Sequence, residues 1–277
     1  MEGVMMRGER SIAMAVRRPN GEIDLTTKPL PNIFTGNMRK IPLVRGVIVL
    51  AESLVLGVQA LLHSANVALE EEEEEMSGPL MWVVLAFSMA FAIGLFFVVP
   101  LLLAELLPDF GLPLAGAAEG VLRIVIFGLY LGAMNLIPSI RSVFAFHGAE
   151  HKTINAYEDG APMEVGAVKR YSTAHLRCGT SFLLTVLIIA IILFTLVGEP
   201  ALWLRIVSRI VLVPFIAGLA YEVTRFSATY EDNPVIHAFF WPGLALQTLT
   251  TRQPNDSQIE VGICALQGAI QADGAQE

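Results

Sequence analysis

The chain has 277 residues, of which 54% are hydrophobic and only 16% are charged. A soluble domain carries about 25% charged residues, so this composition excludes an ordinary soluble protein, a disordered chain and a coiled coil as the main architecture. Two cysteines cannot form a disulfide framework. The net charge of −8 comes mostly from a run of glutamates at 70–75, and no basic stripe of the kind that binds nucleic acid is present.

The first predicted element is a β-hairpin near the N-terminus. Segments 11–16 and 22–27 are rich in residues that favour strands, and they flank the sequence Pro19-Asn20-Gly21. Asn-Gly between two such segments is typical of a tight hairpin turn. We therefore expect residues 1–40 to form a small cytoplasmic β-flap.

Segment 41–62 is apolar but contains Arg45 and Glu52. It is long enough to cross a bilayer, and it could instead lie in the interface or re-enter. If it does not span and the N-terminus is cytoplasmic, 15 of the 18 Lys and Arg residues fall on the cytoplasmic side, as the positive-inside rule requires. We therefore expect an interfacial or re-entrant helix and linker over 41–69, followed by an acidic linker over 70–78.

Four further segments are predicted to span the membrane, because each holds about 20 mostly apolar residues. They are 79–104, 118–137, 181–197 and 202–221. The last contains Arg205 and Arg209, and a charge inside an apolar helix is a sign of function. We expect a four-helix transmembrane domain over 79–222, interrupted by a cytoplasmic loop at 139–180.

Two more helices are predicted in the cytoplasmic region 223–277. Asn233-Pro234 indicates the start of the first, and Ser257 with Glu260 matches a capping box for the second. The predicted fold is therefore an all-α polytopic membrane protein. It has about four transmembrane helices, one interfacial or re-entrant helix and a small N-terminal β-hairpin.

The cytoplasmic loop at 139–180 carries a motif with chemical meaning. His147 and His151 are one helical turn apart and Glu150 shares their face, which is the H-x-x-E-H arrangement. In that arrangement two imidazoles bind zinc and the glutamate acts as general base. Glu158, further along the same side, is a candidate for an additional ligand.

His175 and Cys178 form a second candidate pair, and both residue types suit zinc. They stand just before the third predicted span, whereas His147 follows the second. If these spans are antiparallel neighbours, both motifs meet at the cytoplasmic membrane surface. The site would then hold His147, His151 and His175, with Cys178 or a carboxylate.

Three alternatives remain open at this point. The histidine face could be a polar interfacial helix without any metal. Coordination by three histidines and Cys178 would leave no open position, which is typical of a structural rather than a catalytic zinc. Cys178 itself could be a ligand, an activated thiolate or an inert thiol, but not a disulfide partner in the reducing cytosol.

Four stretches of the chain resemble the YqhQ-like family of bacterial membrane proteins, described as predicted metal-dependent enzymes of unknown function. They are 2–8 (EGVMMRG), 146–152 (FHGAEHK), 175–182 (HLRCGTSF) and the tail at 249–260. The resemblance implies that the family's site residues correspond to His147, Glu150, His151, His175 and Cys178 in this chain. The family usually has a Gly-Gly-Gln stretch before the first motif, and this chain begins inside that motif, which leaves the completeness of the N-terminus open.

The resemblance implies a multi-pass protein of the bacterial inner membrane, and both termini are expected in the cytoplasm. The leading hypothesis is a metal-dependent hydrolase with Glu150 as the catalytic base, the metal ligands given above and zinc as the metal. The alternatives are a membrane scaffold or assembly factor with a structural metal, and a transporter of ions or small molecules. The expected partners are the lipid bilayer and an unidentified substrate, without nucleic acid, and a homo-oligomer is left open.

Overall fold

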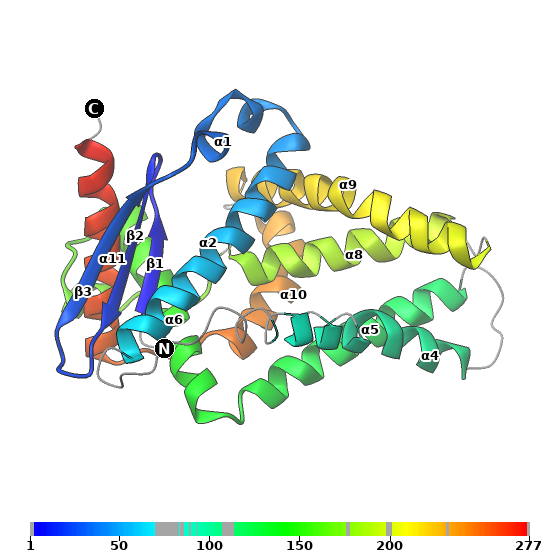
Figure 1. Cartoon of the computed structure of the whole chain (residues 1–277), viewed down its shortest axis with the longest axis horizontal. Coiled ribbons are helices and arrows are strands. Elements are labelled where there is room, and N and C mark those ends of the chain that lie inside the picture. Colours follow the sequence, from blue (N-terminus) through cyan, green and yellow to red (C-terminus); the bar gives the residue numbers. More distant parts are fainter. Residues whose placement is uncertain are drawn as a thin grey trace.

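The computed structural model of the chain describes residues 3–69, 83, 86–88, 90–92, 94–106, 114–175, 178–197, 201–230 and 233–275. It is mostly helical, with one small sheet. In Figure 1 the sheet lies at one end of the molecule, and long helices extend away from it toward the other end. The first element, β1, and the last, α11, both lie at this end of the molecule, and the candidate site lies beside them.

The sheet has three antiparallel strands in the order β1-β2-β3. The strands are β1 (Gly3–Arg7), β2 (Ser11–Arg17) and β3 (Ile23–Pro29). β2 and β3 confirm the predicted hairpin, and Gly21 in their turn has a φ of 91°, which a glycine adopts without strain. β1 was not predicted, because its short GVMMR sequence lacks the β-branched and aromatic enrichment that indicates a strand.

β2 is buried on both faces of the sheet. Ala13 and Ala15 face helix α11 (Asp256–Gly274), and α11 in turn packs against α6 (Pro138–Glu158). Ile12 and Met14 face the opposite way and pack against helix α2 (Val44–Leu69). A sheet covered on both sides explains why the SIAMAV sequence is apolar throughout rather than alternating. The sheet layer thus joins the last helix of the chain to the first long one.

Helix α11 begins two residues earlier than the predicted capping box. Its N-cap is Asn255, whose side chain accepts from the Gln258 backbone N–H, while the Gln258 side chain accepts from the Asn255 backbone N–H. The prediction that Ser257 and Glu260 form this box is therefore wrong, because Asn255 and Gln258 form it two residues upstream. The predicted start at Asn233-Pro234 is confirmed, with Asn233 as N-cap.

The remaining helices form the elongated part of the molecule in Figure 1. They are η2 (Gly94–Val98), α4 (Val99–Glu105), α5 (Leu114–Met134), α8 (Gly179–Val197), α9 (Leu202–Thr229) and α10 (Pro234–Thr250), and three single turns, α1 (Asn32–Thr35), η1 (Asn37–Lys40) and α7 (Val165–Val168), lie elsewhere. α8 packs against α5, α9 and α10, and α2 packs against α9. Gly46 and Gly218 let α2 and α9 approach closely, since a Cβ at Gly46 would lie 2.8 Å from the Gly218 Cα.

Two helical stretches in the described part of the chain are long and apolar enough to cross a membrane, Val44–Ser64 and Gly179–Leu196. A third is added if α5 and α6, which meet at a bend of 103°, count as one span. The first of these stretches is the segment for which we expect an interfacial or re-entrant path, so its length and composition also permit a crossing. The third predicted span, 181–197, coincides with α8.

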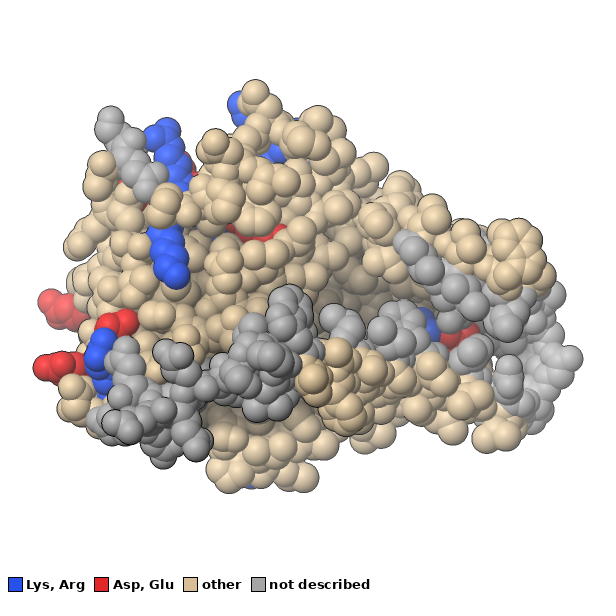
Figure 2. Space-filling model, viewed as in Figure 1, with Lys and Arg blue, Asp and Glu red and all other residues tan. Residues whose placement is uncertain are grey.

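Four spans are not established. Part of the first predicted span, 79–104, and all of the acidic linker, 70–78, lie outside the described residues. The side chains of Arg205 and Arg209 on α9 also lie outside them. Charged side chains are distributed unevenly over the face shown in Figure 2. Most of them lie at the sheet end, and few lie on the visible helical part.

Candidate metal centre

Helix α6 carries the first half of the site. Pro138 occupies the first helical turn, where its missing N–H costs nothing. The helix then presents His147 and His151 on one face, with ring centroids 4.4 Å apart. α6 leaves α5 at a sharp bend and packs against β1 and α11, so the centre lies beside the sheet.

Both imidazoles are oriented by backbone carbonyls. His147 Nδ1 donates to the Thr250 carbonyl at 2.8 Å, and His151 Nδ1 donates to the Thr173 carbonyl at 2.6 Å. The Thr250 carbonyl is available because α10 ends there and the last carbonyls of a helix have no partner within it. Each ring is therefore fixed with Nδ1 occupied, which leaves Nε2 as the coordinating atom, as in metal-bound histidines.

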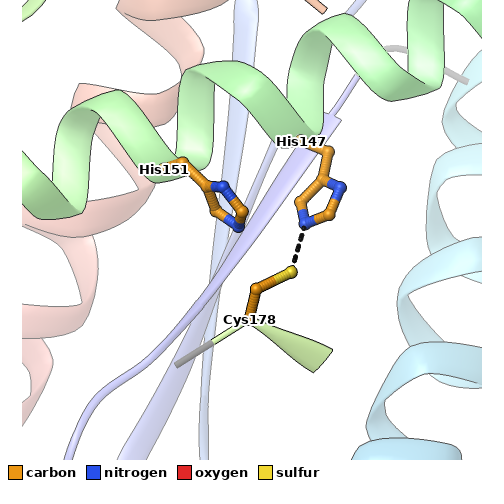
Figure 3. A group of neighbouring side chains, drawn as sticks. All are labelled: His147, His151 and Cys178. Atoms are coloured by element: carbon orange, nitrogen blue, oxygen red, sulfur yellow. Dashed lines mark hydrogen bonds between the residues drawn. The ribbon is translucent and has the colours of Figure 1, made fainter. Parts of the chain in front are cut away.

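Cys178 completes a cluster of three ligand-type side chains. Its Sγ lies 3.4 Å from His147 Nε2, and the ligand atoms of His147, His151 and Cys178 all lie within 4.8 Å of one another. Figure 3 shows the two rings projecting from α6 toward the cysteine, which comes from the segment just before α8. Two imidazole nitrogens and a thiolate are a donor set that suits zinc, and three protein ligands leave a position open.

Cys178 and His147 form a coupled ion pair. Burial is the largest single effect and lowers the pKa of His147, but the hydrogen bond and charge of Cys178, the charge of Glu150 and the hydrogen bond to Thr250 together raise that pKa to about 9. Burial would likewise raise the pKa of the Cys178 thiol, but the hydrogen bond and the charges of both imidazoles lower it to about 5. Near neutral pH the cysteine is a thiolate, which is the form that binds a metal or attacks as a nucleophile.

Glu150 lies on the same face of α6 and interacts electrostatically with the cluster. Removal of its carboxyl from water raises its pKa, and the positive charges of His147 and His151 act in the opposite direction. A carboxyl whose pKa is raised by burial is suited to accept and return a proton. This is the property that a general base beside the centre requires.

Buried Gln247 on α10 holds the segment that carries Cys178. Its Nε2 donates to the His175 carbonyl and to Ser181 Oγ, each at 2.7 Å, and its Oε1 accepts from the His175 backbone N–H at 2.9 Å. The segment is thereby fixed on both sides of Cys178. The same end of α10 provides the Thr250 carbonyl, so one helix positions both halves of the cluster.

The loop that holds His151 is itself fastened to α6. Lys152, which is only 4% exposed, donates to the carbonyls of Lys169 and Tyr171, and burial lowers its pKa. Asn155 donates to the carbonyls of Ser172 and Ala174, at 2.9 and 3.1 Å. These contacts place the Thr173 carbonyl, which lies between them in the chain, against His151.

His175 and Glu158 lie next to the cluster rather than within it. His175 Nε2 contacts Glu158 Oε2 at 3.3 Å, and the His175 ring centroid is 5.8 Å from that of His151. Of the five predicted metal ligands, the structure therefore brings His147, His151 and Cys178 together and pairs the other two with each other. By contrast, Arg45 forms an ion pair with Glu222, and His63 Nε2 lies 3.4 Å from Asp24 Oδ2, both away from the cluster.

Sequence reasoning missed the residues that orient the ligands: Thr173, Thr250, Gln247, Lys152 and Asn155. The two threonines act through backbone carbonyls, and no sequence pattern marks a carbonyl. Lys152 and Asn155 could have been noticed, because a lysine directly beside a metal motif and an asparagine one turn later are polar groups on a packed helix face. Gln247 stands in an otherwise apolar helix, and that contrast is also a signal.

The protein is thus mostly helical, has two or three helical stretches that are able to cross a membrane, and contains a cluster of two histidines and a cysteine. A family model described as "Protein of unknown function (DUF1385)" matches residues 41–272, and the chain belongs to this family. It is 35% identical over 293 residues to the "Uncharacterized protein YqhQ" of Bacillus subtilis (strain 168), with 100% of this chain and 92% of that protein covered. The resemblance to YqhQ-like proteins is thereby confirmed. No solved structure matches the chain.

Proposed function

We propose that the chain is a multi-pass protein of the bacterial inner membrane with a zinc centre at the cytoplasmic face, where it acts as a metal-dependent hydrolase. His147 Nε2, His151 Nε2 and Cys178 Sγ are the ligands, and both termini lie in the cytoplasm. His175 and Glu158 border the centre as a pair. A bound zinc ion would supply Lewis acidity and lower the pKa of water near Glu150.

One observation carries the proposal. Both histidines have Nδ1 fixed on a backbone carbonyl, so their Nε2 atoms converge on the Cys178 thiolate within 4.8 Å. An interfacial helix with no metal needs no such convergence, because its histidines would be satisfied by solvent or headgroups. The coordination position left by three protein ligands favours a catalytic centre over a closed structural one.

Metal content of the detergent-purified protein tests the ligands. We expect near-stoichiometric zinc by elemental mass spectrometry in the wild type, and its loss in His147→Ala/His151→Ala. His63→Ala is the matched control, since it removes a histidine outside the cluster and should keep the metal. No metal in the wild type, even after reconstitution with zinc, would contradict the proposal.

The general-base role is tested separately, once peptide and ester libraries have given a substrate. Glu150→Gln should bind zinc like the wild type and lose most of its turnover, since proton transfer by a positioned side chain contributes roughly 10²–10⁴-fold to a rate. Full activity of this variant would remove Glu150 from the mechanism. Zinc binding with a fourth protein ligand and no turnover would favour a scaffold with a structural metal.

A second candidate follows from the contact between Cys178 and His147. A thiolate 3.4 Å from an imidazole whose other nitrogen is held by a carbonyl has the geometry of a cysteine nucleophile and its base. In this case the protein would act by covalent catalysis without metal. Stoichiometric labelling of Cys178 by an electrophilic substrate analogue in zinc-free, active protein would favour this candidate.

A further inference from the structure

Asn135 lies in the turn that joins α5 to α6, and it organises two arginines. Arg141 Nε donates to the Asn135 carbonyl at 2.6 Å, and Arg252 Nε donates to Asn135 Oδ1 at 3.1 Å. The Asn135 amide in turn donates to the carbonyls of Leu131, at 3.0 Å, and Leu249. One asparagine thus ties α5, α6 and the end of α10 together and anchors two guanidinium groups, each through its Nε.

Each guanidinium group uses its Nε for this anchor. Within the described part of the chain, neither arginine forms an ion pair with a carboxylate, and their terminal nitrogens make no hydrogen bond. Both residues are exposed. The two guanidinium groups are both positively charged and both bound to Asn135, so they repel each other. An anion with several oxygens would relieve that repulsion by accepting hydrogen bonds from the terminal nitrogens of both groups. The pair is therefore built as a site for a phosphate.

The position of the pair indicates where the phosphate comes from. Asn135, which anchors both arginines, directly follows α5, and α5 with α6 forms the bent pair that adds a third possible membrane span if it is counted as one. Leu136 and Ile137, directly beside Asn135, are 73% and 41% exposed. Exposed apolar side chains next to arginines at the end of an apolar helix are typical of the membrane interface, where anionic headgroups attract basic residues.

We propose that Arg141 and Arg252, anchored by Asn135, bind the phosphate of an anionic phospholipid of the cytoplasmic leaflet. This inference rests on the membrane placement in the proposed function but not on the metal. It bears on the same region, because the Arg252 backbone N–H donates to the Phe144 carbonyl at 2.9 Å and the Thr250 carbonyl binds His147. Six helical residues separate Arg141 from His147, which is about 9 Å along α6.

Native mass spectrometry of the full chain in detergent, with phosphatidylglycerol or phosphatidylcholine added, tests the proposal. We expect the wild type to retain one phosphatidylglycerol in preference to phosphatidylcholine. Arg141→Gln/Arg252→Gln should bind phosphatidylglycerol roughly 30-fold more weakly, as expected for the loss of two interfacial arginines. The matched control is Lys28→Gln/Arg170→Gln, which removes the same charge from two exposed sites at the sheet end and should bind like the wild type.

The outcomes separate cleanly. Equal retention of phosphatidylglycerol by the wild type and the arginine variant, with unchanged thermal transitions, would overturn the site while leaving the membrane placement intact. Displacement of the lipid by inorganic phosphate at equal concentration would overturn the assignment to a lipid. Recovery of the wild type from the soluble fraction of cells, without detergent, would instead overturn the membrane placement itself. Zinc content is a separate readout and does not enter this test.

Discussion

His147 and His151 have the same local sequence setting and the same type of anchor, yet the structure gives them different neighbours. His147 contacts the Cys178 sulfur directly, whereas His151 lies between His147 and His175. The hydrogen bond to sulfur makes His147 the main partner of the thiolate. We therefore expect His147 to control the reactivity of Cys178.

This pairing predicts a low pH midpoint for alkylation of Cys178. In zinc-free Cys264→Ser protein, the rate of iodoacetamide labelling should be half-maximal near the thiol pKa of about 5, instead of near the ordinary 9, because the thiolate persists down to that pH. His147→Ala should move the midpoint upward, since the main stabilising contact is lost. Intact-mass measurements across the pH range from about 4 to 10 would record both curves.

The control for this experiment is Cys178→Ser in the same background, which should show no labelling. A midpoint between about 8 and 9 in the protein with His147 intact would contradict the ion pair. Cys264 is removed from the background because burial raises its pKa and its labelling would overlap the upper part of the curve.

At the scale of residues, the sequence predicted that His147, His151 and Cys178 would come together, but it did not indicate the backbone carbonyls and polar side chains that orient them. Spacing alone indicates that His147, Glu150 and His151 share a helix face, because i, i+3 and i+4 positions do so in any α-helix. The approach of Cys178 depends on how α8 packs, and the sequence indicated it only through residue type. The pairing of His175 with Glu158 depends on the path of the loop after α6, which no periodicity records.

At the scale of elements, α6 and the end of α10 must lie very close together for His147 to meet its carbonyl. Gly148 makes this contact, because a Cβ at that position would lie 2.0 Å from the Arg252 carbonyl oxygen. The opposing atom belongs to the backbone and cannot move away as a side chain could. The segment between His147 and His151 therefore contains a glycine for a packing reason.

Gly148→Ala should consequently separate the two elements and weaken the centre. We expect a loss of about 1–3 kcal/mol in the free energy of unfolding, as in other overpacked contacts, together with reduced zinc occupancy. Thermal unfolding and elemental analysis would measure the two effects. Gly166→Ala in α7 is the control, since nothing lies within 4 Å of its new Cβ, and it should be neutral or stabilising. Wild-type zinc occupancy in Gly148→Ala would show that the close approach is dispensable.

The elements themselves were predicted unevenly. The β2–β3 hairpin and the start of α10 carry strong local signals, in Asn20-Gly21 and in Asn233-Pro234, and both are where the sequence predicts them. The strand β1 was not predicted, because it is stabilised by its pairing with β2 rather than by the preferences of its own residues. The path of segment 41–62 is a question of the membrane rather than of local propensity, and a helix forms there in either case.

At the scale of the whole molecule, a buried carboxylate joins the sheet to the helical part. Glu52 on α2 is only 4% exposed, and it accepts from Arg7 Nε of β1 at 3.0 Å and from an Arg39 terminal nitrogen of η1 at 2.5 Å. The three elements thus share one charged cluster. Removing the carboxylate would leave two partly buried arginines close together.

Glu52→Gln should destabilise the junction between the sheet and α2 by about 1–3 kcal/mol, a value reduced from that of a fully buried pair because both arginines are partly exposed. Hydrogen exchange should become faster in β1 and η1 while that of α8 is unchanged. Glu9→Gln, at an exposed position of the same region, is the control and should have no effect. Uniformly faster exchange throughout the molecule would argue against a local junction.

The packing of α11 on the sheet has a consequence for the order in which the protein is made. About 240 residues separate the end of β2 from the start of α11, and a ribosome needs roughly ten to fifty seconds to add them. During that interval Ala13 and Ala15 lack their cover, and His147 lacks the Thr250 carbonyl. Closure of the sheet and assembly of the histidine–cysteine cluster are therefore late events of biosynthesis, because both need segments that are translated long after β2.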